Sequence, residues 1–167
     1  MAKKVIEINK VVEKKAKNET ETTIRKIKFD VDTWIPKINY VNANIQSDKE
    51  IICKGKKEAL DEFVFAMQAL KDFFLETCEI ENKKDDTIIT QVSFSEKGVI
   101  ITAKIYLRNK EIDPLNINTP LLRYVKNGGS YELEDEILNL LDELKRAAND
   151  YISGKTKFVQ TTMKFGT

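Results

Sequence analysis

The sequence predicts an α+β fold in which an antiparallel sheet carries two amphipathic helices packed on one face. Three observations indicate this class: β-branched, partly alternating segments, two longer stretches whose apolar residues recur every three or four positions, and short polar connections between strands. The 167 residues are 41% hydrophobic and 33% charged, as in an ordinary globular domain. We expect a single domain over residues 1–154 and a C-terminal tail at residues 155–167.

The first half of the chain predicts strands followed by one helix. Residues 5–13 and 22–31 are expected to pair as a hairpin, with two weaker strands at residues 38–45 and 49–54. A helix is predicted between residues 56 and 79, and its apolar face consists of Leu60, Phe63, Val64, Met67, Leu70 and Phe74. Phe65 and Phe73 lie off this face, so either the helix is covered on more than one side or these rings contact a partner.

The second half predicts a hairpin, a loop and a long helix. Residues 87–95 and 99–108 flank a short polar loop that ends at Gly98, which is typical of a β-hairpin. On the first strand, even-numbered residues from Ile88 to Phe94 are expected to share one face. A loop is expected around residues 113–120. The helix is predicted to begin with Ser130 as its N-cap, to end near Ser153 and to be terminated by Gly154.

The chain contains no histidine, and this absence argues against many enzymatic functions. Histidine is the usual general base near neutral pH and the commonest metal ligand. Nucleophilic serine and cysteine are normally activated by such a base; a serine–lysine pair is formally open, but Ser93 and Ser95 have no recognisable motif around them. We therefore expect a protein that is not an enzyme and has no catalytic residue.

Metal and cofactor sites are not expected either. Cys53 and Cys78 are too far apart in sequence to resemble a metal-binding pair and are expected to be buried, reduced thiols. A disulfide between them is the alternative, which a reducing compartment disfavours. Carboxylates at residues 30 and 32, or 85 and 86, are the candidates for magnesium, and the second pair resembles turn residues. The chain begins without an apolar signal segment and has no long apolar stretch, so we expect a cytoplasmic protein without membrane contact.

Charge is unevenly distributed although the net charge is only +1. Residues 1–28 carry nine Lys or Arg against four Glu, whereas residues 132–144 hold six acids and no base. Lys104, Tyr106 and Arg108 are expected to alternate on the side of their strand opposite the core, where a tyrosine between two cations favours base stacking and phosphate attraction. These three residues are the candidates for binding single-stranded DNA, extended by lysines of the N-terminal hairpin. The same pattern is also typical of an ordinary solvent-facing strand.

The C-terminal tail contains a second candidate site. Gln160, Met163 and Phe165 resemble the short peptides with which bacterial replication proteins bind a sliding clamp: a glutamine, two variable residues, an aliphatic residue and a terminal phenylalanine. The residue before the phenylalanine and the two after it depart from that pattern. Alternatively, Phe158, Val159, Met163 and Phe165 form a last strand or pack on the core.

Residues 115–123, of sequence LNINTPLLR, and residues 147–155, of sequence AANDYISGK, resemble small uncharacterised proteins of phage and prophage genomes. Such proteins pair a hairpin, an Asn-Thr-Pro element and a Tyr-x-x-Gly-Lys helix end with a glutamine-containing tail. The resemblance covers roughly residues 87–165 and none of the first 80. It implies an accessory role in phage DNA replication or recombination, and it implies no catalytic residues.

The expected function is therefore a non-enzymatic accessory protein that binds single-stranded DNA, a sliding clamp, or both. The alternative is an inhibitor of a host defence protein, which needs only a surface of complementary charge. A structural virion component is a third possibility, which self-assembly would reveal.

Overall fold

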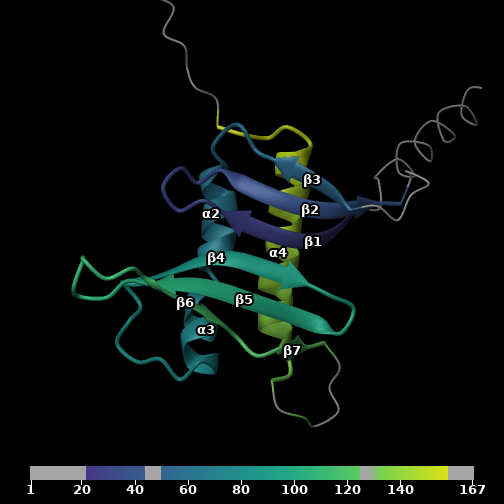
Figure 1. The fold of residues 1–167 in the computed structure, drawn as a ribbon. Coiled ribbons are helices and arrows are strands. Elements are labelled where there is room, and N and C mark those ends of the chain that lie inside the picture. Colours follow the sequence, from purple (N-terminus) through teal and green to yellow (C-terminus); the bar gives the residue numbers. More distant parts are fainter. Residues whose placement is uncertain (1–21, 44–49, 125–128, 130, 158–167) are drawn as a thin grey trace, which may run out of the picture.

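The computed structural model describes residues 22–43, 50–124, 129 and 131–157. It contains an antiparallel seven-stranded sheet with strand order β3-β2-β1-β4-β5-β6, and β7 pairs with β5 (Figure 1). The strands are β1 Thr22–Phe29, β2 Pro36–Asn42, β3 Ile51–Lys54, β4 Thr87–Phe94, β5 Gly98–Ile105, β6 Leu115–Asn118 and β7 Leu122–Arg123. The described helices are α2 Asp61–Gln68, α3 Lys71–Thr77 and α4 Asp135–Ile152. The predicted α+β class and antiparallel sheet are confirmed.

The sheet consists of two three-stranded units that meet along one short seam. The chain enters β1, turns back through β2 and β3, and later forms β4, β5 and β6 in the same manner. The seam joins β1 to β4 over only three residue pairs, from Lys26 opposite Ser93 to Lys28 opposite Gln91. The strand predicted at residues 22–31 is present as β1, but it ends at Phe29, and β2 and β4 are its neighbours. Its predicted partner at residues 5–13 lies outside the described residues.

The helix predicted between residues 56 and 79 is divided into α2 and α3 at Ala69 and Leu70. Gln68, at the end of α2, bonds the backbone of β4: its amide Nε2 donates to the Ile89 carbonyl at 2.8 Å, and Ile89 N donates to Gln68 Oε1 at 3.0 Å. The break leaves Leu70 fully buried, and Phe74 in α3 is fully buried as well. Helical periodicity alone did not predict the break between α2 and α3. The break coincides with hydrogen bonds between Gln68 and a distant strand of the sheet.

The strand β4 also departs from simple alternation. A bulge between Ile89 and Gln91 shifts its register against β5, so that Ile89, Thr90 and Val92 are all buried. The predicted grouping of even-numbered residues was therefore wrong before the bulge and right after it, because one extra residue exchanges the two faces of a strand.

The helix α4 begins at Asp135 and not at residue 130, which lies outside the described residues. Residues 131–133 are occupied by backbone bonds with β7, because Arg123 N donates to the Tyr131 carbonyl and Leu133 N donates to the Arg123 carbonyl. Those residues cannot be helical at the same time.

The loop expected around residues 113–120 contains β6, and β7 follows it. The predicted end is confirmed: α4 stops at Ile152, and Gly154 has a φ of +99°.

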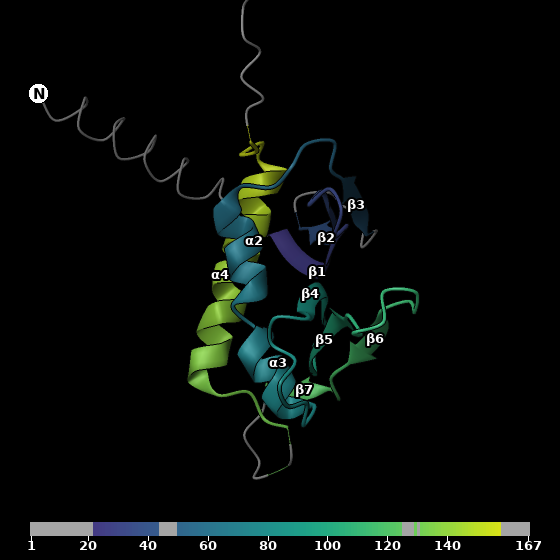
Figure 2. The same cartoon turned by 90° about the vertical axis from the view of Figure 1, so that its left-hand side faces the viewer.

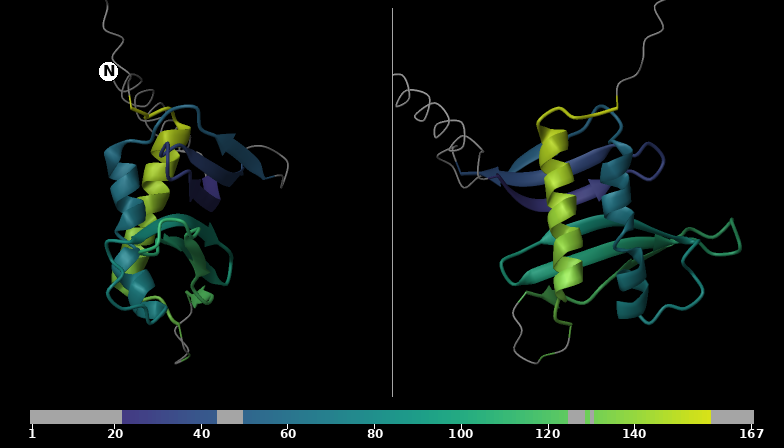
Figure 3. Two further views of the ribbon diagram at one scale, coloured as in Figure 1. Left: turned by 60° about the vertical axis from the view of Figure 1, so that its left-hand side comes forward. Right: turned by 180° about the vertical axis from the view of Figure 1, so that it is seen from behind.

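The core lies between the helices and one face of the sheet. Cross-strand partners Ile38, Ile27, Val92 and Ile101 form a fully buried row across β2, β1, β4 and β5. In Figure 2 the three helices lie together on one side of the strands, and the edge strands β3 and β6 lie farther from them than β1 and β4 do. Figure 3 shows α4 and α2 side by side across the strands. None of the described helices is long and apolar enough to span a membrane.

Candidate nucleic-acid interface

Charged residues are sorted by layer in the described part of the chain. The strands contain basic residues and no Asp or Glu; their basic residues are Arg25, Lys26, Lys28, Lys37, Lys54, Lys104 and Arg123. The described helices are mainly acidic; their acids are Asp61, Glu62, Asp72, Glu76, Asp135, Glu136, Asp142, Glu143 and Asp150, against Lys71, Lys145 and Arg146. A nearly neutral chain thus has a basic sheet and an acidic helical layer.

We call the sheet face opposite the buried row the open face. Its side chains alternate with the buried ones, and none of them belongs to the core. They include Lys26, Lys28, Lys37, Asn39, Ile52, Lys54, Ile88, Gln91, Ser93, Ile100, Thr102, Lys104, Asn116 and Asn118. Five of these fourteen side chains are lysines, and none is acidic.

The strand register aligns three of these lysines in one row. Lys28 lies opposite Lys37, and Lys37 lies opposite Lys54, so the row crosses β1, β2 and β3. All three side chains are exposed. Like charges directly opposite one another in a sheet are destabilising. Fold stability therefore does not explain the row, and an anionic partner would.

The same row continues across the other half of the sheet without charge. Lys28 lies opposite Gln91, Gln91 opposite Thr102, and Thr102 opposite Asn118. The Thr102 hydroxyl donates to the Asn118 amide oxygen at 2.8 Å. The open face therefore has a cationic half on β1–β3 and a half rich in amides and hydroxyls on β4–β6.

The open-face lysines have no ion pair among the described residues. The ion pairs that the structure does contain join helices and loops: Lys83–Asp86, Lys84–Asp72, Lys145–Asp142, Lys155–Asp150, Lys157–Glu58 and Lys157–Asp61. Five basic side chains outside the open face are therefore partly neutralised. On the open face, Lys104 attracts Asp30 and helps to lower its pKa, whereas the other four lysines have no described acid at ion-pair distance and remain available to an external anion.

The structure separates the three residues predicted to bind DNA. Lys104 lies on β5, opposite Ile88 on one side and Asn116 on the other. The strand ends at Ile105, so Tyr106 and Arg108 belong to the following loop, where they help to line a separate hollow of about 520 Å³. Tyr106 is 38% exposed. The predicted position on the side of the strand opposite the core is therefore confirmed for Lys104. It is wrong for Tyr106 and Arg108, because the strand ends before them.

The remaining predicted groups are the C-terminal tail residues and the two cysteines, and the structure describes only the cysteines. Gln160, Met163 and Phe165 lie outside the described residues. Cys53 and Cys78 are free thiols as predicted, but they are half-buried and not buried. Partial burial raises the pKa of both thiols, which disfavours the reactive thiolate. Among the described residues, no group of three or more acidic or cysteine side chains is arranged to hold a metal ion.

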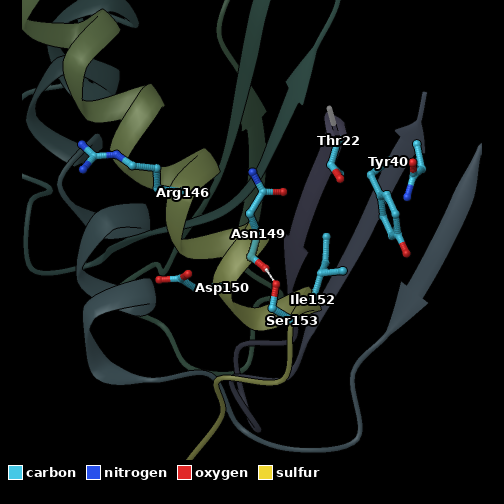
Figure 4. Close-up of a pocket in the computed structure, with 8 residues that line it drawn as sticks. Thr22, Tyr40, Arg146, Asn149, Asp150, Ile152 and Ser153 are labelled. Atoms are coloured by element: carbon cyan, nitrogen blue, oxygen red, sulfur yellow. Dashed lines mark hydrogen bonds between the residues drawn. The ribbon is translucent and has the colours of Figure 1, made fainter. Parts of the chain in front are cut away.

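A larger hollow of about 600 Å³ lies between α4 and the β1–β2 hairpin (Figure 4). Its polar side chains do not converge on one point. Arg146 extends away from Thr22 and Tyr40, Asp150 pairs with Lys155 at 2.7 Å, and the Ser153 hydroxyl donates to the Asn149 carbonyl. This geometry does not favour a small-molecule site, because such sites aim a few polar groups at one ligand.

The open face is therefore the described surface whose chemistry most favours a ligand. Comparison with protein-family models, with curated proteins and with solved structures finds no match to this chain.

Proposed function

We propose that this protein binds single-stranded DNA on the open face of its sheet, as a non-enzymatic accessory protein of DNA replication or recombination. The observation that carries the proposal is the row of Lys28, Lys37 and Lys54, which the register aligns and whose members form no ion pair with a described acid. Phosphate attraction supplies most of the affinity of sequence-independent nucleic-acid binding. The role in replication or recombination comes from the resemblance of residues 87–165 to phage and prophage proteins.

The dimensions of the sheet favour a single strand over a duplex. Six neighbouring strands span about 24 Å at the usual spacing of about 4.8 Å, which is twice the width of about 12 Å of the major groove. The open face is too broad to enter that groove. Amide side chains and three isoleucines lie between the lysines. On a face that cannot enter the groove, such groups reach bases only where a single strand exposes them.

The first test is fluorescence anisotropy of a labelled single-stranded oligonucleotide over a range of salt concentrations. We expect log affinity to fall linearly with log salt concentration. Replacing Lys28, Lys37 and Lys54 together with glutamine should weaken binding on the order of a hundredfold at 0.1 M salt and make the slope shallower by about 2, because three phosphate contacts are lost. The variant should be at least as stable as the wild type, because lysine repulsion is removed.

The matched control removes the same number of charges elsewhere. Lys83, Lys84 and Lys145 are ion-paired outside the open face, and their replacement by glutamine should change the affinity less than about threefold. Equal losses in the two variants would show that net charge and not the open face governs binding. Absence of wild-type binding even at low salt would overturn the proposal.

A protein partner is the second candidate function, and the opposite charges of the two layers favour it. Complementary potentials accelerate the encounter of two proteins and select between partners. An inhibitor of a host protein would form a stable complex with that protein and ignore DNA. In the accessory role, Gln160, Met163 and Phe165 remain the candidates for docking on a sliding clamp.

A further inference from the structure

A hollow of about 260 Å³ opens on the open face where β1 separates from β4. The two strands stay paired only from Lys26 to Lys28, after which the chain turns towards β2 at Asp30 while β4 continues to Thr87. From the helical layer, Gln68 bonds the Ile89 backbone of β4 beyond this seam. The N–H and carbonyl of Ile89 are thus hydrogen-bonded from the helix side of the sheet. Side chains of the strands line the hollow.

The lining combines two cations with uncharged groups that can pair with a base. Lys28 comes from β1 and Lys104 from β5, and between them lie Gln91, Thr102 and Asn116. The register explains this convergence, because Gln91 is the partner of both Lys28 and Thr102, and Asn116 is the partner of Lys104. Two ammonium groups suit a phosphate, whereas side-chain amides both donate to and accept from base edges.

Two carboxylates of the β1–β2 turn also border the hollow, and one of them is compensated. Oδ1 of Asp30 accepts hydrogen bonds of 3.0 Å from Asp32 N, Thr33 N and the Thr33 hydroxyl. These bonds compensate most of the Asp30 charge within its own turn, and Lys104, which lines the same hollow, adds a weaker attraction that also lowers the Asp30 pKa. Asp32 is exposed at the rim, and a carboxylate there can accept a hydrogen bond from a base amino group.

We propose that this hollow is a nucleotide subsite, in which Lys28 and Lys104 hold one phosphate while Gln91 and Asn116 contact the edge of the attached base. The inference rests on the proposed function and adds a base contact to its phosphate contacts. The volume is near the lower end of small-molecule sites, about 300 Å³, and therefore suits one nucleotide unit of a longer strand.

The test separates base contact from charge. The double variant Gln91→Ala with Asn116→Ala keeps every lysine, and it is titrated with two single-stranded oligonucleotides of equal length, one intact and one fully abasic. We expect it to bind the intact strand about tenfold more weakly than the wild type does, which corresponds to one good base contact. On the abasic strand, wild type and variant should bind equally. Asn139→Ala, which changes an exposed amide of α4 outside the open face, should match the wild type on both strands.

The outcomes distinguish the two proposals. If the wild type binds with salt dependence but the double variant discriminates intact from abasic strands as the wild type does, the subsite is overturned and the DNA-binding function stands. An equal loss on both strands would also overturn the subsite, because the amides would then act without a base. If the wild type binds neither strand at any salt concentration, the function and the subsite both fail. Thermal unfolding of each variant identifies any loss caused by misfolding.

Discussion

At the scale of single residues, Asp30 organises the turn that borders the hollow. Hydrogen bonds from the Thr33 side chain, from Thr33 N and from Asp32 N lower its pKa below the ordinary value of 3.8. The folded state therefore favours the ionised carboxylate, and the contribution to stability is present above pH 3.8 and is lost as the pH falls through the folded pKa.

The corresponding variant is Asp30→Asn. We expect the wild type to be more stable than this variant at pH 7 and the difference to shrink as the pH falls below about 3.8, where both side chains become neutral. Urea unfolding of both proteins between pH 7 and pH 2.5 measures the difference. A gap that stays constant over this range would mean that the carboxylate charge does not stabilise the turn.

At the scale of elements, the aromatic residues Phe65 of α2 and Phe74 of α3 differ sharply in burial. Phe74 of α3 is fully buried, whereas Phe65 of α2 is 69% exposed and Phe73 packs partly against the core. Phe65 and Phe73 both lie off the predicted apolar face of the helix. The structure covers Phe73 but leaves Phe65 uncovered. Phe65 remains open for contact with a partner.

Substitution by alanine should separate these roles. Phe74→Ala should lower the free energy of unfolding by about 3–5 kcal/mol, because it removes a buried ring and leaves a cavity. Phe65→Ala should change it by less than about 0.5 kcal/mol. Chemical denaturation of both variants measures the difference, and similar losses would show that Phe65 is covered by another part of the chain.

At the scale of the whole molecule, the separation of charge between layers matters more than the net charge of +1. A surface with one sign of charge binds a charged matrix even when the protein as a whole is almost neutral. The open face should therefore govern retention on a cation exchanger at neutral pH.

The two triple-lysine variants test this expectation because they have equal net charge. The Lys28, Lys37 and Lys54 variant should elute from the exchanger at clearly lower salt than the Lys83, Lys84 and Lys145 variant. Co-elution of the two would indicate that the basic strands do not form a continuous charged surface.

The sequence alone determined the features that depend on neighbouring residues. Alternation and the polar loop that ends at Gly98 predicted the hairpin of β4 and β5, three- and four-residue spacing predicted the helix α4, and glycine chemistry predicted its end at Gly154. It also placed Lys104 opposite the core, because the side of a strand to which a residue points is a local property. Strands predicted at residues 22–31, 38–45 and 49–54 correspond to β1, β2 and β3 for the same reason.

Only the tertiary structure decided which strands are neighbours and in which register they pair. The row of Lys28, Lys37 and Lys54 and the hollow beside Lys104 depend on pairings between distant segments. The break before Leu70 and the late start of α4 likewise accompany bonds to distant strands, which local propensity does not contain. Periodicity specifies the face of each element, but long-range pairing specifies which faces combine, and the candidate site is a product of that combination.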